Sequence, residues 1–185
     1  MTENTHRQQQ AKVLRLVRKI HRYTGASLFL VFLFVSITGL LLGWKKDSGG
    51  YLLPNTQRGM STNPTEWMYL DELQILAAHL LDSLDHDLDP AIDRLDIRPE
   101  RGIVKFTFQH HYQELQLDLA TGELLSYGKR RSDWLEHVHD GSIVDLALGT
   151  GFFKLLYTSV AGLALLTFTV TGFWLWYGPR RMRAR

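Results

Sequence analysis

Residues 24–44 read TGASLFLVFLFVSITGLLLGW, and residues 152–177 read FFKLLYTSVAGLALLTFTVTGFWLWY. A helix needs about 20 mostly apolar residues to cross the hydrocarbon core of a bilayer, and each stretch has that length. Because backbone polar groups cannot remain unpaired in lipid, each stretch should form a complete helix. No small-residue cleavage site follows the first stretch, which indicates a retained helix rather than a signal peptide. We therefore expect a membrane protein with two spanning helices.

Charge is distributed unevenly around these two stretches. Residues 1–23 carry six basic and one acidic side chain, and residues 179–185 carry four basic ones. Residues 45–151 carry 10 basic and 18 acidic side chains, a net charge of −8. Because excess Lys and Arg stay in the cytoplasm, this pattern predicts cytoplasmic termini and an exported middle, although Lys45 and Lys46 oppose the rule. The basic ends are better explained by topology and anionic lipid than by nucleic-acid binding.

Composition divides the whole chain into seven segments. They are a basic cytoplasmic or interfacial helix (1–23), the first span (24–44), a loop (45–65), a compact domain (66–128), a segment that returns to the membrane (129–151), the second span (152–178) and a basic tail (179–185). The basic helix either lies at the interface or runs straight into the first span. The loop is rich in Gly, Ser, Asn, Thr and Pro.

The compact domain combines one helical pattern with several strand patterns. Apolar residues recur at helical spacing in one stretch, namely Leu73, Leu76, Ala77, Leu80, Leu81 and Leu84. Apolar and polar residues then alternate over 94–98, 104–109 and 114–119, and a further apolar stretch covers 124–127. Gly122 lies in the turn before this last stretch and can take a positive φ. We expect a half-buried antiparallel sheet covered by one helix, which makes the fold a two-span membrane protein with a small α+β domain.

The composition also excludes several kinds of site. The chain has no cysteine, which excludes disulfides, thiolate metal sites and covalently attached c-type haem. No GxGxxG fingerprint for flavin or nicotinamide lies between a strand and a helix, so any reductant must come from a quinol or a partner protein. The acidic run Asp85–Asp89 resembles a calcium loop, but Pro90 stands where that loop needs glycine.

Three motifs in a fixed order resemble the PepSY-associated transmembrane family. His21-Arg-Tyr-Thr-Gly25 opens the first span, and Asp118-Leu-Ala-Thr-Gly-Glu-Leu-Leu125 closes the compact domain like a PepSY hairpin. Trp134-Leu-Glu-His-Val-His-Asp-Gly141 then precedes a span that contains Thr171-Gly172. Larger members of the family resemble ferric-siderophore reductases of the bacterial inner membrane, which have four spans, two PepSY-like units and b-type haem held by histidines. This chain has half as many spans.

The resemblance implies a location in the bacterial inner membrane, with the PepSY-like domain in the periplasm. It also implies a b-type haem electron-transfer protein that supports reduction of ferric chelates or of another periplasmic acceptor. Such a protein would be a haem-dependent ferric reductase or an electron-transfer subunit of one, acting as a minimal unit, a homodimer or part of a larger membrane complex. The alternative is a non-redox PepSY module that binds a periplasmic protein or peptide, or a structural subunit.

Three histidines are candidates for binding the haem. His21 lies at the mouth of the first span, where ionisable residues are costly and often functional. His139 matches the family's His-x-Gly step, and His137 lies about 200° around a helix from it. His21 and His139 fall on opposite membrane faces, about 30 Å apart, so they cannot share one iron. Either each pairs with its symmetry mate in a dimer, or residues 133–151 dip into the membrane.

Other features have less specific interpretations. Gly39-Leu-Leu-Leu-Gly43 is a GxxxG motif, which favours either dimer contact or packing of the two spans within one chain. His110 and His111 are expected on the sheet, facing opposite sides, as surface residues. The aromatic residues near the span ends, among them Trp44, fit an interfacial belt. Finally, Thr38-Gly39 and Thr171-Gly172 each lie about six residues before the aromatic residue that ends a span, which makes the Thr-Gly dipeptide a small internal repeat.

Overall fold

The computed structural model describes residues 2–183, with side chains described for residues 8–181. The first residues of the predicted 1–23 segment and the last residues of the predicted 179–185 tail therefore lie outside the described side chains. The chain forms two compact units. One unit comprises the chain up to Leu40 together with residues from His137 onward, and the other comprises Leu41–Glu136.

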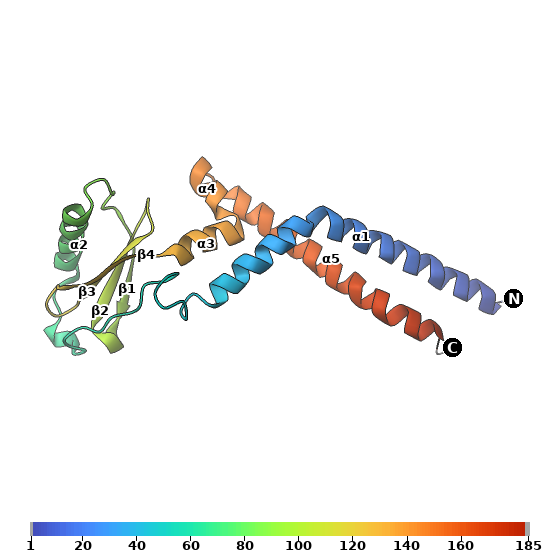
Figure 1. Ribbon diagram of the computed structural model, residues 1–185, viewed down its shortest axis with the longest axis horizontal. Helices are drawn as coiled ribbons and strands as arrows, with labels where there is room; N and C mark the ends of the chain where they lie inside the picture. Colours follow the sequence, from blue (N-terminus) through green and yellow to red (C-terminus); the bar gives the residue numbers. More distant parts are fainter. Residues whose placement is uncertain (1, 184–185) are drawn as a thin grey trace. The chain divides into compact units, whose positions relative to one another are not determined.

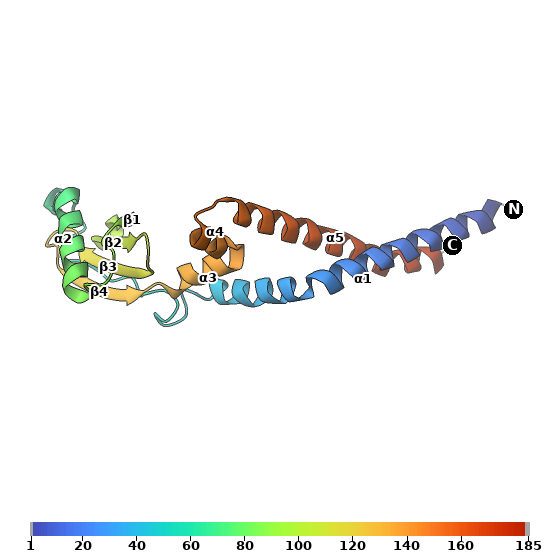
Figure 2. The same ribbon diagram turned by 90° about the horizontal axis from the view of Figure 1, so that it is seen from above.

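The first unit is a hairpin of two long helices, α1 (Thr2–Gly43) and α5 (Phe152–Arg183). They run antiparallel, so that the start of α1 and the end of α5 lie at the same end of the hairpin (Figure 1, Figure 2). α1 is continuous, which shows that the basic segment and the first apolar stretch form one helix. Both helices are long and apolar enough to cross a membrane, and the two predicted apolar helices are confirmed.

The two long helices face each other along a narrow stripe. Their least exposed positions recur alternately after three and four residues, which is the spacing of two helices packed side by side. In α1 these positions include Leu14, Val17, His21, Thr24, Leu28, Val31, Val35 and Thr38, and in α5 they include Tyr157, Ala161, Ala164, Phe168, Thr171, Leu175 and Gly178. Most other apolar side chains of both helices point outward, as expected for lipid-facing surfaces. The stripe is where polar side chains are sheltered.

Two short helices precede α5 in the chain. α3 (Arg131–Asp140) and α4 (Ser142–Leu148) both lie within the predicted 129–151 segment. Gly141 separates them with a φ of +80°, and a Cβ atom there would lie 3.0 Å from the Tyr157 ring. An L side chain would therefore meet both backbone strain and a clash at this position.

The second unit is the α+β domain that the periodicity predicts. Its sheet has the order β1-β2-β3-β4, with all neighbours antiparallel. The strands are β1 (Ile92–Arg98), β2 (Ile103–Phe108), β3 (Gln113–Asp118) and β4 (Leu124–Lys129), and α2 (Leu70–Leu84) packs on them. Short 3-10 turns occupy Pro64–Glu66 and Pro99–Arg101. Gly122 has a φ of +71°, as predicted.

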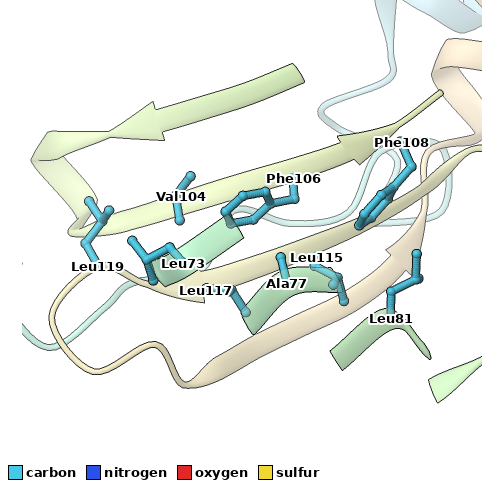
Figure 3. Close-up of a cluster of buried hydrophobic side chains, with 9 residues drawn as sticks. All are labelled: Leu73, Ala77, Leu81, Val104, Phe106, Phe108, Leu115, Leu117 and Leu119. Atoms are coloured by element: carbon cyan, nitrogen blue, oxygen red, sulfur yellow. The ribbon is translucent and has the colours of Figure 1, made fainter. Parts of the chain in front are cut away.

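The core lies between α2 and one face of the sheet. Figure 3 shows the α2 residues pointing toward the apolar side chains of β2 and β3. The cluster consists of Leu73, Ala77, Leu81, Val104, Phe106, Phe108, Leu115, Leu117 and Leu119. Nine buried side chains give this small domain its own core, because each fully buried large apolar side chain contributes about 1.5–3 kcal/mol.

The other face of the sheet differs from the prediction of a half-buried sheet. Residues 55–60 cross this face, and they bury Lys105 to 3% exposure and Glu114 to 1%. Gln116 binds the crossing segment from both ends of its amide, accepting from Gln57 N at 2.9 Å and donating to Asn55 O at 3.0 Å. The prediction of a half-buried sheet was wrong for the central strands β2 and β3, because the alternation reports which side chains share a face, but not what covers that face.

The buried polar side chains satisfy one another. Glu114 accepts hydrogen bonds from Gln116 at 2.7 Å and from Arg130, and it lies 3.6 Å from Lys105 Nζ. Lys105 also donates to Thr56 Oγ1 at 2.9 Å. Burial lowers the pKa of Lys105, and the nearby Glu114 carboxylate opposes that shift. The buried Glu114 carboxylate thus compensates Lys105 and shares the partly buried Arg130 with Asp133.

His110 and His111 lie in the turn between β2 and β3, not on the sheet as predicted. His110 is exposed, and the ring of His111 stacks on Phe108 with centroids 5.1 Å apart. The strand pattern ends at Phe108 because the chain reverses there, and the sequence alternation extends one residue too far.

Candidate functional site

His21 lies on the α1 stripe that faces α5. Its Nδ1 atom is 2.9 Å from Thr171 Oγ1, and its ring stacks on Phe168 with centroids 4.0 Å apart. Gly25, one turn further along α1, leaves room for Phe168, since a Cβ atom there would lie 2.8 Å from that ring. A Cβ atom at Gly172 would lie 3.3 Å from His21 Cε1. The imidazole is thus held between a threonine, a glycine and an aromatic ring.

His139 occupies an equivalent setting at the other end of the hairpin. It comes from α3, and its Nδ1 atom is 2.7 Å from Thr38 Oγ1 on α1. A Cβ atom at Gly39 would lie 3.5 Å from His139 Cε1. Each histidine therefore packs on a Thr-Gly step of a long helix and hydrogen-bonds the threonine through Nδ1. The repeated Thr-Gly motif in the sequence, Thr38-Gly39 and Thr171-Gly172, corresponds to this repeated arrangement.

The threonine bonds decide which nitrogen of each ring carries the proton. Thr38 Oγ1 donates to Phe34 O at 2.8 Å, and Thr171 Oγ1 donates to Thr167 O at 2.6 Å. Because a hydroxyl has only one proton, each threonine oxygen must accept from the histidine. Nδ1 is therefore protonated in both rings. In a neutral imidazole this leaves the lone pair on Nε2, which is the form that ligates metals.

Neither Nε2 atom is hydrogen-bonded within the part of the chain that the structure describes. The same residues bring together no group of three or more His, Cys, Asp or Glu side chains that could hold a metal ion. A bare zinc ion needs three or four protein ligands, and no such group forms around either histidine among these residues. Haem takes fewer ligands from the protein, and His21 and His139 are the residues that could hold it.

The structure keeps the two histidines apart. His21 and the Thr38 partner of His139 are 17 residues apart on α1, which corresponds to about 25 Å of helix. They do not meet at one atom, in agreement with the sequence argument that they cannot share an iron. His137 is half-buried two residues before His139 and lies on a different side of α3.

The GxxxG motif is used asymmetrically. Gly39 faces His139 within the same chain, whereas a Cβ atom at Gly43 would meet no heavy atom of the described residues within 4 Å. Only the first glycine therefore has a close neighbour in this hairpin.

On α5, the Arg180 guanidinium lies 4.0 Å from the Trp176 ring, which places a cation and an aromatic together near the end of the span.

Asp145 fixes the start of α5 close to the His139 site. Its carboxylate accepts hydrogen bonds from Thr150 Oγ1 at 2.6 Å and from the amides of Phe153 and Lys154 at 3.0 and 2.7 Å. The Thr150 hydrogen bond, followed by these amides, lowers the pKa of Asp145. The first amides of a helix have no partner within the helix, so this carboxylate serves as the cap.

Sequence reasoning identified both histidines but not Thr38 and Thr171, because a hydroxyl inside a long apolar helix usually bonds its own backbone. Here each threonine hydroxyl donates to a carbonyl of its own helix and also accepts a hydrogen bond from a histidine. The repeated Thr-Gly step was the signal that could have found them. Asp145 was also missed, since nothing in its spacing marks it as a cap for a helix that starts seven residues later.

Comparisons with known proteins gave one family match. The model of the PepSY-associated TM region matches residues 18–185, which includes both Thr-Gly steps and all three candidate histidines. A search of curated proteins found no match.

Proposed function

The chain belongs to the PepSY-associated TM region family, and on that premise we propose that it is a b-type haem electron-transfer protein of the bacterial inner membrane. The single observation that supports this proposal is the pair of His–Thr contacts, His21–Thr171 and His139–Thr38. Each contact sets the Nδ1–H tautomer and leaves Nε2 as a ligand atom. A hydrogen bond to the far nitrogen of a ligating histidine fixes ring orientation and raises ligand basicity.

In this proposal His21 and His139 would hold the haem iron, with His137 as a neighbouring residue. Bound haem would supply one-electron transfer, and two histidine ligands would suit that role because they leave no open coordination position. The chain itself orients each imidazole through threonine and keeps a glycine against the ring edge. Phe168 additionally holds the His21 ring by stacking.

The separation of the histidines has a consequence for assembly. At about 25 Å along α1 they would serve two different irons, one toward each end of the hairpin. Each iron would then need its second histidine from another chain. A homodimer, in which each histidine pairs with its symmetry mate, supplies both second ligands with no further subunit. A larger membrane complex is the other arrangement that supplies them.

The charge pattern supports the membrane orientation that this proposal needs. The described basic side chains at the open end of the hairpin, such as Arg15, Arg18 and Arg180, favour a cytoplasmic location for both termini. The acidic α+β domain would then be periplasmic. A quinol or a partner protein would donate electrons, and a ferric chelate or another periplasmic acceptor would receive them.

Haem content per chain tests the proposal. We expect purified full-length protein from haem-replete cells to contain haem, and we expect His21→Ala and His139→Ala each to lose about half of it. The double variant should lose nearly all of it. His79→Ala, an exposed histidine on α2, is the matched control and should retain full content. Equal haem content in wild type and double variant would exclude these ligands, and absence of haem from wild type would exclude the proposed function.

A further inference from the structure

Three successive cations at the end of β4 have different environments. Arg130 pairs with Glu114, and its Nε donates to Asp133 at 2.6 Å, so it belongs to the buried polar network. Its neighbours Lys129 and Arg131 are exposed, and neither pairs with a carboxylate among the residues that the structure describes. The domain that carries them is acidic overall, so these two cations without a paired carboxylate form a local region of positive charge.

These two cations line a pocket of about 410 Å³ within the second unit. The other lining residues are aromatic or leucine, namely Leu41, Tyr51, Leu52, Tyr112, Trp134 and Leu135. Arg131 is held in place, because its guanidinium lies 4.5 Å from the Tyr51 ring and donates to Tyr51 O at 3.0 Å. Trp134 remains 47% exposed. The pocket therefore offers positive charge beside an apolar, aromatic wall.

The chain places this pocket beside the end of a span. Leu41 lies two residues before the end of α1, in the last turn of the apolar stretch. Trp44, Lys45 and Lys46 follow directly. Leucine, tryptophan and tyrosine next to lysine and arginine are the composition of a membrane–water interface.

We propose that this pocket binds the headgroup of an anionic phospholipid from the leaflet in which α1 ends. Lys129 and Arg131 would contact the phosphate, while Leu41 and Trp134 would pack on the glycerol and the first acyl carbons. The proposal accounts for Lys45 and Lys46, which oppose the charge rule on this side but would add to the attraction for anionic lipid. It does not depend on haem.

Lipid retention by the full-length protein tests this inference. The protein, purified in a mild detergent, is incubated with equal amounts of phosphatidylglycerol and phosphatidylcholine, and retained lipid is counted by native mass spectrometry. We expect wild type to retain phosphatidylglycerol preferentially. The K129Q/R131Q variant should lose about 10- to 30-fold of that preference, since each cation near an anionic surface contributes on the order of 1 kcal/mol.

The matched control is R58Q/R101Q, which removes two exposed cations elsewhere on the same domain and should retain the preference. Circular dichroism verifies that both variants keep the wild-type helix content, and K129E/R131E, a second test of the same site, should lose phosphatidylglycerol without losing phosphatidylcholine. Unchanged lipid preference in K129Q/R131Q, or an equal loss in the control, would overturn the proposal. Displacement of the lipid by millimolar inorganic phosphate would also overturn it, by indicating a site for a free anion.

Discussion

Two glycines, Gly39 and Gly172, determine how closely the histidines approach the long helices. A Cβ atom would lie 3.5 Å from His139 Cε1 at the first and 3.3 Å from His21 Cε1 at the second. A methyl group at Gly39 would make an ordinary van der Waals contact and one at Gly172 a tight contact, whereas a larger side chain at either position would meet the imidazole. The histidines are therefore positioned by the absence of a side chain on one side and by a threonine hydroxyl on the other.

Gly172→Leu should displace His21 from Thr171 and reduce haem content by about half, because leucine would occupy the space of the imidazole. Gly162→Leu on the same helix is the matched control, since a Cβ atom there meets nothing within 4 Å among the described residues. Haem content and the reduced absorption spectrum are the readouts. Equal behaviour of the two variants would show that Gly172 does not position His21.

Glu114 is the residue on which the second face of the sheet depends. Replacing it with glutamine would leave the buried Lys105 without its carboxylate partner, and Arg130 would keep only its bond to Asp133. Breaking a buried ion pair from one side costs about 3–5 kcal/mol, so Glu114→Gln should lower the free energy of opening of β2 and β3 by roughly that amount. Hydrogen exchange of the strand amides in the full-length protein measures it.

Lys105→Met is the comparison for that variant. It should cost much less, because Glu114 would still compensate Arg130, and burial already disfavours the charged form of Lys105. The lowered pKa of Lys105 also determines whether the stability of the domain rises or falls with pH. Since the unfolded state binds the proton more tightly, stability should rise as the pH increases through the folded-state pKa of Lys105 toward its ordinary value. An equal cost for both variants would contradict this account.

At the scale of elements, the periodicity of the sequence predicted where the helices and strands lie, but it did not predict which segments cover their surfaces. The helical spacing of Leu73, Ala77 and Leu81 located α2, and the alternation over 104–109 located β2. The covering of the second face was missed because residues 55–60 have neither period, and their course is fixed by hydrogen bonds to Gln116 and Lys105. The histidine partners were missed for the same reason, since they come from packing between segments far apart in sequence.

The start of α5 depends on Asp145 from a different helix. Asp145→Ala should remove the acceptor for Thr150 and for the amides of Phe153 and Lys154, so these amides should exchange hydrogen faster. Asp145→Asn keeps one acceptor oxygen and should have a smaller effect, and Asp47→Ala, an exposed carboxylate, is the control.

The pH dependence of this cap follows from the same bonds. The pKa of Asp145 is lowered in the folded chain, so its contribution is fully present above its ordinary pKa and is lost as the pH falls through the folded-state value. Protection of the α5 amides that is insensitive to both the alanine substitution and acid would contradict the capping role.

At the scale of the whole molecule, the proposed topology can be tested without background labelling, because the chain has no cysteine. Single cysteines at Gln8 and Asp87 should react differently with a membrane-impermeant maleimide. We expect the Asp87→Cys variant to be labelled in spheroplasts and the Gln8→Cys variant only after lysis. The reverse pattern would place the α+β domain in the cytoplasm and would contradict the charge argument.

The most direct test of the central claim is the visible absorption spectrum of detergent-purified, full-length protein, recorded oxidised and then after reduction with dithionite. If His21 and His139 ligate haem iron, the reduced protein should show the sharp α and Soret bands of low-spin b-type haem. Those bands should weaken in each single alanine variant and disappear in the double variant. A featureless spectrum from cells well supplied with haem would contradict the claim and leave the two histidine–threonine pairs as packing contacts.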